Sequence, residues 1–83
     1  MTHPNATALA VTIKQKAEEL RELLARIDDC ISEQHQHATA TEDVEEMERL
    51  ASAEPFKWLD AAKASMQMGV MHALRAVEQP TGF

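Results

Sequence analysis

The sequence predicts an all-α fold: a helical hairpin of two long helices with a short helix before the second, assembled into a compact homo-oligomer. Strong helix formers, chiefly Ala, Leu, Glu, Gln, Met, Lys and Arg, dominate its 83 residues. The few β-branched residues never alternate with polar residues over the length of a strand. A chain this short usually needs disulfides, a metal or self-association for stability. Since Cys30 is the one cysteine, self-association is expected.

The first long helix is predicted from a repeating apolar pattern. We expect a flexible N-terminal arm over residues 1–5, one helical-hairpin domain over residues 6–79 and a tail over residues 80–83. Apolar residues recur at steps of three and four, which is close to heptad spacing: Leu9, Ile13, Ala17, Leu20, Leu24, Ile27 and Ile31. Val11, Leu23 and Cys30 widen this seam, and we expect Cys30 to be a buried structural thiol.

A polar stretch over residues 32–41 (SEQHQHATAT) interrupts the seam and is expected to be a fraying helix end and a connector. His35 and His37 lie within it, and so few scattered histidines do not form a recognisable zinc motif. Thr41 before two acidic residues predicts the start of a short helix, because a hydroxyl cap followed by acids complements the helix dipole.

The last helix is expected to run from Pro55 to about Glu78 and to end before Pro80. Its residues are apolar or small on nearly all sides, so it should be buried against other helices. Gly69 inside this helix costs about 1 kcal/mol relative to alanine. Close approach of another helix is the simplest feature that would offset this cost.

The charge balance limits the classes of function. The formal net charge is −6, which disfavours DNA or RNA polymers as partners because their binding requires many cations. No apolar run approaches the roughly 18 residues of a membrane span, so no membrane partner is expected. We find no convergent carboxylates, nucleophile with a base, or metal-ligand set, and therefore expect no catalytic residue, metal or cofactor and no enzymatic activity. A small anionic ligand remains compatible with a few local cations.

Lys57 and Trp58 follow the break at Pro55. A cation, an aromatic face and free N–H groups at a helix start together suit a ligand that combines phosphates with a base. The alternative is that Trp58 is a core anchor and Lys57 a solvated neighbour.

The segment from Phe56 to Phe83 carries a more specific pattern. It contains Lys57-Trp58, Gln67-x-Gly69-x-Met71, Leu74-Arg75-Ala76-Val77 and Pro80, and the first helix has an Ile13-Lys14 start followed by a leucine seam. This pattern resembles the phage anti-CBASS cyclic-oligonucleotide sponge family, whose helical hairpin is shared with a phage anti-Thoeris sponge. One element is displaced, because Met66-Gln67-Met68-Gly69 stands where the family usually has Leu-Gln before the glycine.

The resemblance implies a homo-oligomer, typically a hexamer, acting in the cytoplasm of the infected bacterial host. Such a protein binds cyclic di- or trinucleotide immune signals between its subunits and sequesters them without cleavage. Lys14 corresponds to the lysine of the family's Ile-Lys start, and Lys57 to the basic residue before Trp58. Lys16 corresponds to a position lining the trinucleotide pocket, and Arg75 belongs to the shared motif.

Two departures bear on the ligand. The family has arginine where this chain has Lys57, and lysine does not offer the planar, two-pronged grip of a guanidinium. Family members also have an aromatic residue before the first helix, whereas this chain has no tyrosine. Either His3 takes that place or the dinucleotide site is weakened or lost. The competing hypothesis is a structural or protein-binding helical oligomer with no nucleotide ligand.

Overall fold

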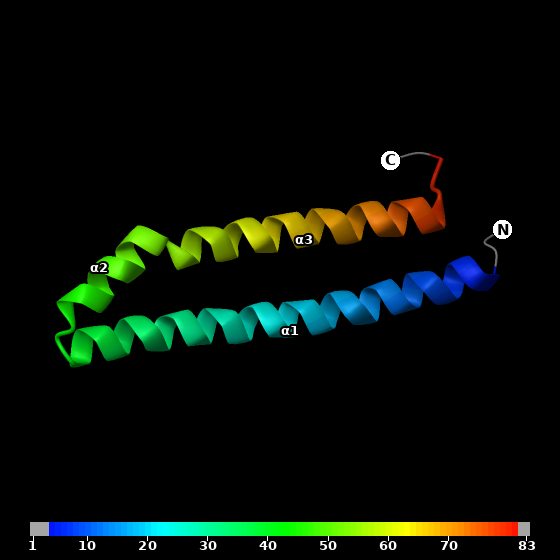
Figure 1. The fold of residues 1–83 in the computed structure, drawn as a ribbon. Helices are drawn as coiled ribbons and strands as arrows, with labels where there is room; N and C mark the ends of the chain where they lie inside the picture. Colours follow the sequence, from blue (N-terminus) through cyan, green and yellow to red (C-terminus); the bar gives the residue numbers. More distant parts are fainter. Residues whose placement is uncertain (1–3, 82–83) are drawn as a thin grey trace.

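The computed structural model describes residues 4–81 and consists of three helices: α1 (Pro4–Ala40), α2 (Val44–Ala53) and α3 (Pro55–Glu78). The helices α1 and α3 run antiparallel beside each other, and α2 lies at the turn end of the hairpin (Figure 1). The predicted hairpin with a short helix before its second arm is confirmed, and residues 4–81 contain no strand. The predicted assembly into an oligomer stays a prediction.

Helix α1 is longer than the sequence pattern suggested. It begins at Pro4, two residues before the expected start, and continues to Ala40. The prediction of a connector over residues 32–41 was therefore wrong. The physical reason is that the buried positions continue at heptad spacing through the polar stretch, and Ala38 is only 1% exposed. This buried series consists of Ala10, Ala17, Leu24, Ile31 and Ala38. The part of the expected arm over residues 1–3, including His3, lies outside the described residues.

Helix α2 begins at Val44, three residues after Thr41, and Thr41 is not its cap. Asp43 is the N-cap, and its carboxylate accepts a hydrogen bond of 3.1 Å from the backbone N–H of Glu46. Thr41 instead donates its hydroxyl to the carbonyl oxygen of His37, at 2.8 Å, and so closes the end of α1. The prediction of Thr41 as the cap was wrong because its hydroxyl bonds backward to the preceding helix.

Helix α3 begins and ends where the sequence indicated. Glu54 adopts the left-handed conformation (φ 50°) between α2 and α3, and Pro55 opens the first turn of α3. Proline suits this position because its missing N–H would have no partner inside the helix. At the other end, the N–H of Gln79 bonds to the carbonyl oxygen of Arg75, one residue before Pro80.

The core between the two arms is narrow. Leu24 and Ile31 of α1 pack with Leu59 of α3, and Ala62 lies against this cluster. The chain measures 61 × 20 × 14 Å and has a radius of gyration of 18.6 Å. A compact domain of this length would have a radius of gyration of about 12 Å. One hairpin therefore buries only one side of each long helix.

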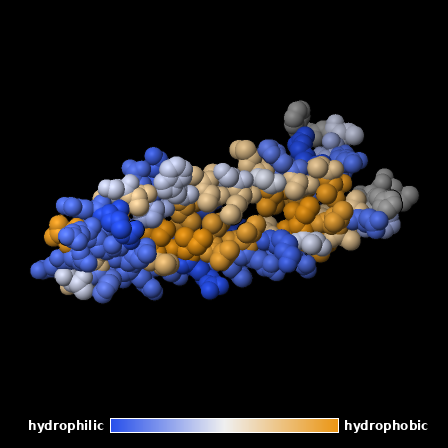
Figure 2. Space-filling view, in the orientation of Figure 1, coloured by the Kyte–Doolittle hydropathy of each residue, from blue (hydrophilic) through white to orange (hydrophobic). Residues whose placement is uncertain are grey.

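Much apolar surface stays exposed in a single chain. Leu9 and Ile27, both expected in the seam, are 54% and 39% exposed. Cys30 is exposed, so the prediction of a buried thiol is wrong for the single chain, because the position lies beside the buried series rather than in it. Hydrophobic residues gather along the middle of the hairpin, whereas the turn end is hydrophilic (Figure 2).

Candidate functional site

The pair Lys57 and Trp58 lies in the first turn of α3, at the turn end of the hairpin. The indole of Trp58 is 65% exposed, and the Lys57 Nζ atom lies 5.7 Å from the centre of its ring. Lys57 also forms an ion pair of 3.2 Å with the carboxylate of Glu54. Trp58 is therefore not a core anchor within the single chain, and its ring face is open beside a cation.

The backbone at the start of α3 offers less to an anion than expected. The N–H groups of Lys57 and Trp58 both bond to the carbonyl oxygen of Glu54, at 3.1 and 3.3 Å. Pro55 has no N–H, so only the amide of Phe56 remains in the first four positions of the helix. The sequence-based expectation of several free N–H groups there was wrong. A phosphate at this point would therefore meet at most one backbone N–H group, that of Phe56, beside the side chain of Lys57.

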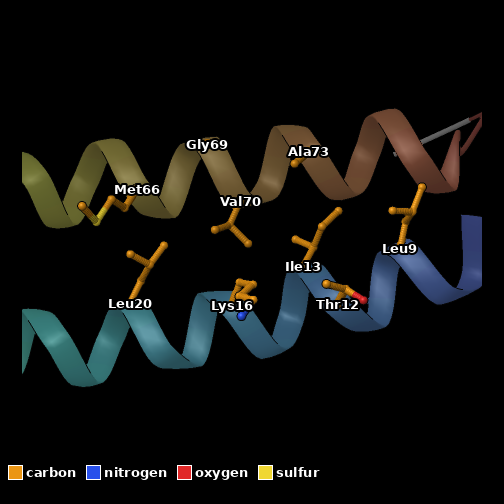
Figure 3. Close-up of a pocket in the computed structure, with 9 residues that line it drawn as sticks. All are labelled: Leu9, Thr12, Ile13, Lys16, Leu20, Met66, Gly69, Val70 and Ala73. Carbon is orange, nitrogen blue, oxygen red and sulfur yellow. The ribbon is translucent and has the colours of Figure 1, made fainter.

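The other predicted site residues lie toward the open end of the hairpin. Lys14 and Lys16 are exposed on α1, and Lys16 forms an ion pair of 3.2 Å with Glu19. Arg75 is exposed near the end of α3. In Figure 3, Lys16 lies over α1 with its nitrogen turned away from α3.

A single chain does not bring the Lys57–Trp58 pair together with the predicted residues at the open end. Lys16 and Val70 line the same groove, so they lie at the same level of the hairpin. Lys57 is separated from that level by the stretch of α3 between positions 57 and 70, which spans roughly 20 Å at 1.5 Å per residue. The five predicted residues therefore form one site only if different copies contribute to it, and otherwise they form two sites.

Two grooves run between α1 and α3. The first, the glycine groove, has a volume of about 350 Å³, and the surface facing it is apolar. The side chains of Ile13, Leu20 and Val70 extend into the space between the helices there (Figure 3). The groove is lined by Leu9, Thr12, Ile13, Lys16, Leu20, Met66, Gly69, Val70 and Ala73.

The second groove, the charged groove, has a volume of about 710 Å³ and includes Arg21, Asp28 and Lys63. Arg21 pairs with Glu18, and Lys63 Nζ lies 3.6 Å from the carboxylate of Asp28 across the two helices. The sequence analysis did not nominate Arg21 or Lys63. The i, i+4 spacing of Lys63, Gln67 and Met71 was the available signal, because it places them on one side of α3.

Helix α2 carries a further charged pair, which lies outside these grooves. Arg49 donates two hydrogen bonds to the carboxylate of Glu46 on α2, one of them at 2.7 Å from Nε. This contact is the first cause that holds the pKa of Glu46 below its ordinary value of 4.5. Within residues 4–81, no group of three or more His, Cys, Asp or Glu residues is arranged to hold a metal ion. Over the same residues, no helix is both long and apolar enough to cross a membrane.

Comparison with known proteins shows that the chain is similar to a phage protein. The chain is 43% identical over 47 residues to Anti-CBASS protein 2 of Pseudomonas phage JBD67. The match covers 57% of this chain and 43% of the phage protein, so the chain spans less than half the length of this relative. No protein-family model matches the chain. The resemblance to phage anti-CBASS proteins that the sequence motifs predicted is confirmed.

Proposed function

We propose that this chain, as a relative of Anti-CBASS protein 2, is a phage counter-defence protein that binds and sequesters cyclic di- or trinucleotide signals without cleaving them. The match of 43% identity over 47 residues carries the proposal. The protein would act in the cytoplasm of the infected bacterium, where such signals are made. Sequestration requires binding alone, so no residue is assigned a catalytic role.

The Lys57–Trp58 pair supports a nucleotide ligand in particular. A base that stacks on an exposed indole contributes about 1–3 kcal/mol to binding, and Trp58 is 65% exposed. Lys57 lies 5.7 Å from the same ring and can reach a phosphate attached to the stacked nucleoside. Its exposed pair with Glu54 is a weak competitor, because surface ion pairs contribute at most about 1 kcal/mol. Lys57 can therefore exchange the carboxylate of Glu54 for a phosphate of the ligand.

The remaining cations support pockets that lie between subunits. Lys14, Lys16 and Arg75 lie toward one end of the hairpin, and Lys57 lies toward the other. A cyclic oligonucleotide carries several phosphates around one ring, so cations from two or more copies would meet them together. The exposed apolar surface of α1 and α3 also supports a homo-oligomer, because contact between copies would bury it. A hexamer is proposed from the family resemblance.

A different function is favoured by one observation on α3. Met68 and Met71 are 59% and 62% exposed, and methionine is frequent on adaptable protein-binding surfaces. A structural or protein-binding helical oligomer without a nucleotide ligand would use the same residues. The two functions differ in whether a purified, folded oligomer binds any cyclic nucleotide.

The proposal is tested by isothermal titration calorimetry with a panel of cyclic di- and trinucleotides, followed by chromatography of the recovered ligand. Submicromolar binding with intact ligand is expected, and a Lys57→Ala variant should bind at least one ligand class about tenfold more weakly, the loss of one charge-assisted contact. Arg49→Ala is the matched control, since Arg49 also pairs with a glutamate three residues before it. Absence of heat with every ligand, from a folded oligomer, would favour the protein-binding function.

The assignment of residues has its own test within the same titrations. If Lys57→Ala and Lys14→Ala both keep full affinity for every ligand, the proposed site is wrong even where the chain binds nucleotides. Recovery of linearised or hydrolysed ligand would contradict sequestration.

A further inference from the structure

The charged groove is formed within one chain by both long helices, and the proposed function leaves it without a role. Its volume of about 710 Å³ lies within the usual range of ligand pockets, roughly 300–1,000 Å³. A mostly apolar lining with a few polar groups is the arrangement that binds organic ligands of mixed character. The apolar part of the lining comes from α1 and α3 alike and includes Leu20, Leu24, Val70 and Leu74.

Arg21 lies in this groove without an acidic partner on the opposite helix. Lys63 of α3 pairs with Asp28 of α1 across the groove. One heptad nearer the open end of each helix, the same alignment places Arg21 opposite Val70, which is apolar. Arg21 pairs instead with Glu18 on its own helix, and both side chains of that pair are exposed. Because exposed ion pairs are weak, Arg21 is available to a phosphate.

Gln67 of α3 supplies a hydrogen-bond donor and an acceptor close to Arg21. It lies three residues from Val70, or about 4.5 Å along the helix axis. Its side-chain amide makes no hydrogen bond to any of residues 4–81. An amide pairs with a base edge that offers one donor beside one acceptor, as adenine does through N6 and N7. Guanine offers two acceptors on the corresponding edge, so it matches an amide less well.

Met71 provides an apolar surface against which the ring of a base can lie. It follows Gln67 by four residues, so the two side chains lie on the same side of α3. Met71 lines the charged groove and is 62% exposed. Thioether sulfur makes favourable contacts with aromatic rings. A base in contact with Met71 therefore has its edge near Gln67 and its phosphate near Arg21.

The acidic residues of the groove lie toward its other end. Asp28 is paired with Lys63. Asp29 lies eight residues from Arg21 along α1, or about 12 Å. The groove therefore has a basic end at Arg21, and an anionic group is favoured there.

We infer that the charged groove is a binding site for an adenine nucleotide. Arg21 binds its phosphate, Gln67 binds the edge of its base and Met71 contacts the face of the base. The inference rests on the proposed function for the choice of a nucleotide among anionic ligands, and it adds a second site within one chain and a preference for adenine. A cyclic oligonucleotide occupies the groove with one adenosine unit, so a cyclic ligand with guanine alone binds there more weakly.

Nuclear magnetic resonance with methyl-labelled methionine resolves the two sites in one titration. The methyl group of Met71 reports on the charged groove, and the indole N–H of Trp58, the single tryptophan, reports on the Lys57–Trp58 pair. Met68 lines neither groove, so its methyl signal is the control and should not move. The Met71 signal should respond to cyclic di-AMP with a dissociation constant at least about fivefold lower than to cyclic di-GMP, the usual minimum for one paired base edge.

Two substitutions test the assigned contacts. Arg21→Gln should weaken the Met71 response about tenfold, the loss of one charge-assisted contact, and Gln67→Leu should remove the preference for cyclic di-AMP. Arg26→Gln and Gln15→Leu are the matched controls, because both residues are exposed on α1 and line neither groove. All four replacements are good helix formers, so circular dichroism should show wild-type helicity. An unchanged Met71 response in Arg21→Gln, or a preference that persists in Gln67→Leu, would overturn the inference.

The two signals keep this inference separate from the proposed function. A response to cyclic ligands at Trp58 with none at Met71 would leave sequestration standing and overturn the groove as a site. If neither cyclic ligand binds, 5′-AMP is titrated. A Met71 response to 5′-AMP that Arg21→Gln weakens would then support the groove and contradict the proposed function. No response to any of the three ligands would contradict both.

Discussion

The imidazole of His35 stacks on the ring of Phe56, with centroids 5.5 Å apart and an angle of 22° between the planes. This contact joins the last third of α1 to the first turn of α3. The Nδ1 atom of His35 donates to the carbonyl oxygen of Ile31 at 2.9 Å, which fixes the ring. Phe56 directly precedes Lys57 and Trp58, so the stack holds the helix turn that presents the candidate ligand pair.

Removing this stack should destabilise the hairpin locally. His35→Ala is expected to lower the free energy of unfolding by about 1 kcal/mol, the usual contribution of an aromatic pair beyond its buried area. Denaturant unfolding followed by circular dichroism measures this change. His37→Ala is the control, because His37 is exposed two residues further along the same helix. An equal effect of the two substitutions would show that the stack adds nothing.

The turn between α1 and α2 contains a backbone conformation that glycine would adopt more easily. Glu42 has a φ of 53°, in the left-handed region. Glu42→Gly should therefore be more stable than Glu42→Ala by about 1 kcal/mol, the cost of this region for a residue with a Cβ. Both variants lose the same carboxylate, so the comparison isolates the backbone. Thermal unfolding of the two variants checks it, and a more stable alanine variant would contradict the expectation.

The sequence predicted the helices better than it predicted their ends. The start of α3 at Pro55 and its end before Pro80 were confirmed because proline acts locally, through its own backbone. The polar stretch after Ile31 was wrongly expected to be a connector, since its composition is polar. Its helical state depends on Ala38 and on the ring of Phe56, which a reading of α1 alone does not include.

The candidate site was predictable to a similar degree. The sequence motif identified Lys57 and Trp58 as neighbours, and the structure places the Lys57 Nζ atom over the Trp58 ring, 5.7 Å from its centre. The motif gave no indication that the N–H groups of both residues donate to the carbonyl oxygen of Glu54. Nor could it locate Lys63 opposite Asp28, because that pair depends on how α3 is aligned along α1.

The Glu46–Arg49 pair on α2 predicts a defined response to pH. The hydrogen bonds from Arg49 lower the pKa of Glu46 below its ordinary value of 4.5. A carboxyl group with a lowered pKa in the folded state stabilises that state above its unfolded pKa, and this stabilisation is lost as the pH falls further. The loss should therefore occur below pH 4.5. In an Arg49→Ala variant, NMR titration should show the pKa of Glu46 moving upward, and an unchanged value would contradict the assigned cause.

Two matched ion pairs can show which lysine binds the ligand phosphates. Lys57 pairs with Glu54 and Lys16 pairs with Glu19, each at 3.2 Å and three residues apart. If Lys57 binds a phosphate, Glu54→Gln should increase affinity, because the ligand no longer displaces a carboxylate. The increase should be at most about fivefold, since exposed pairs contribute about 1 kcal/mol or less.

Glu19→Gln makes the same charge change beside Lys16, toward the opposite end of the hairpin. Calorimetry with one cyclic dinucleotide and one cyclic trinucleotide should separate the two lysines. A gain from Glu54→Gln alone assigns that ligand to the Lys57–Trp58 pair, and a gain from Glu19→Gln alone assigns it to Lys16. Equal gains from both would indicate a composite site or a general effect of net charge. A Glu22→Gln variant distinguishes these, because a general effect of net charge would also appear when this exposed glutamate of α1 is changed.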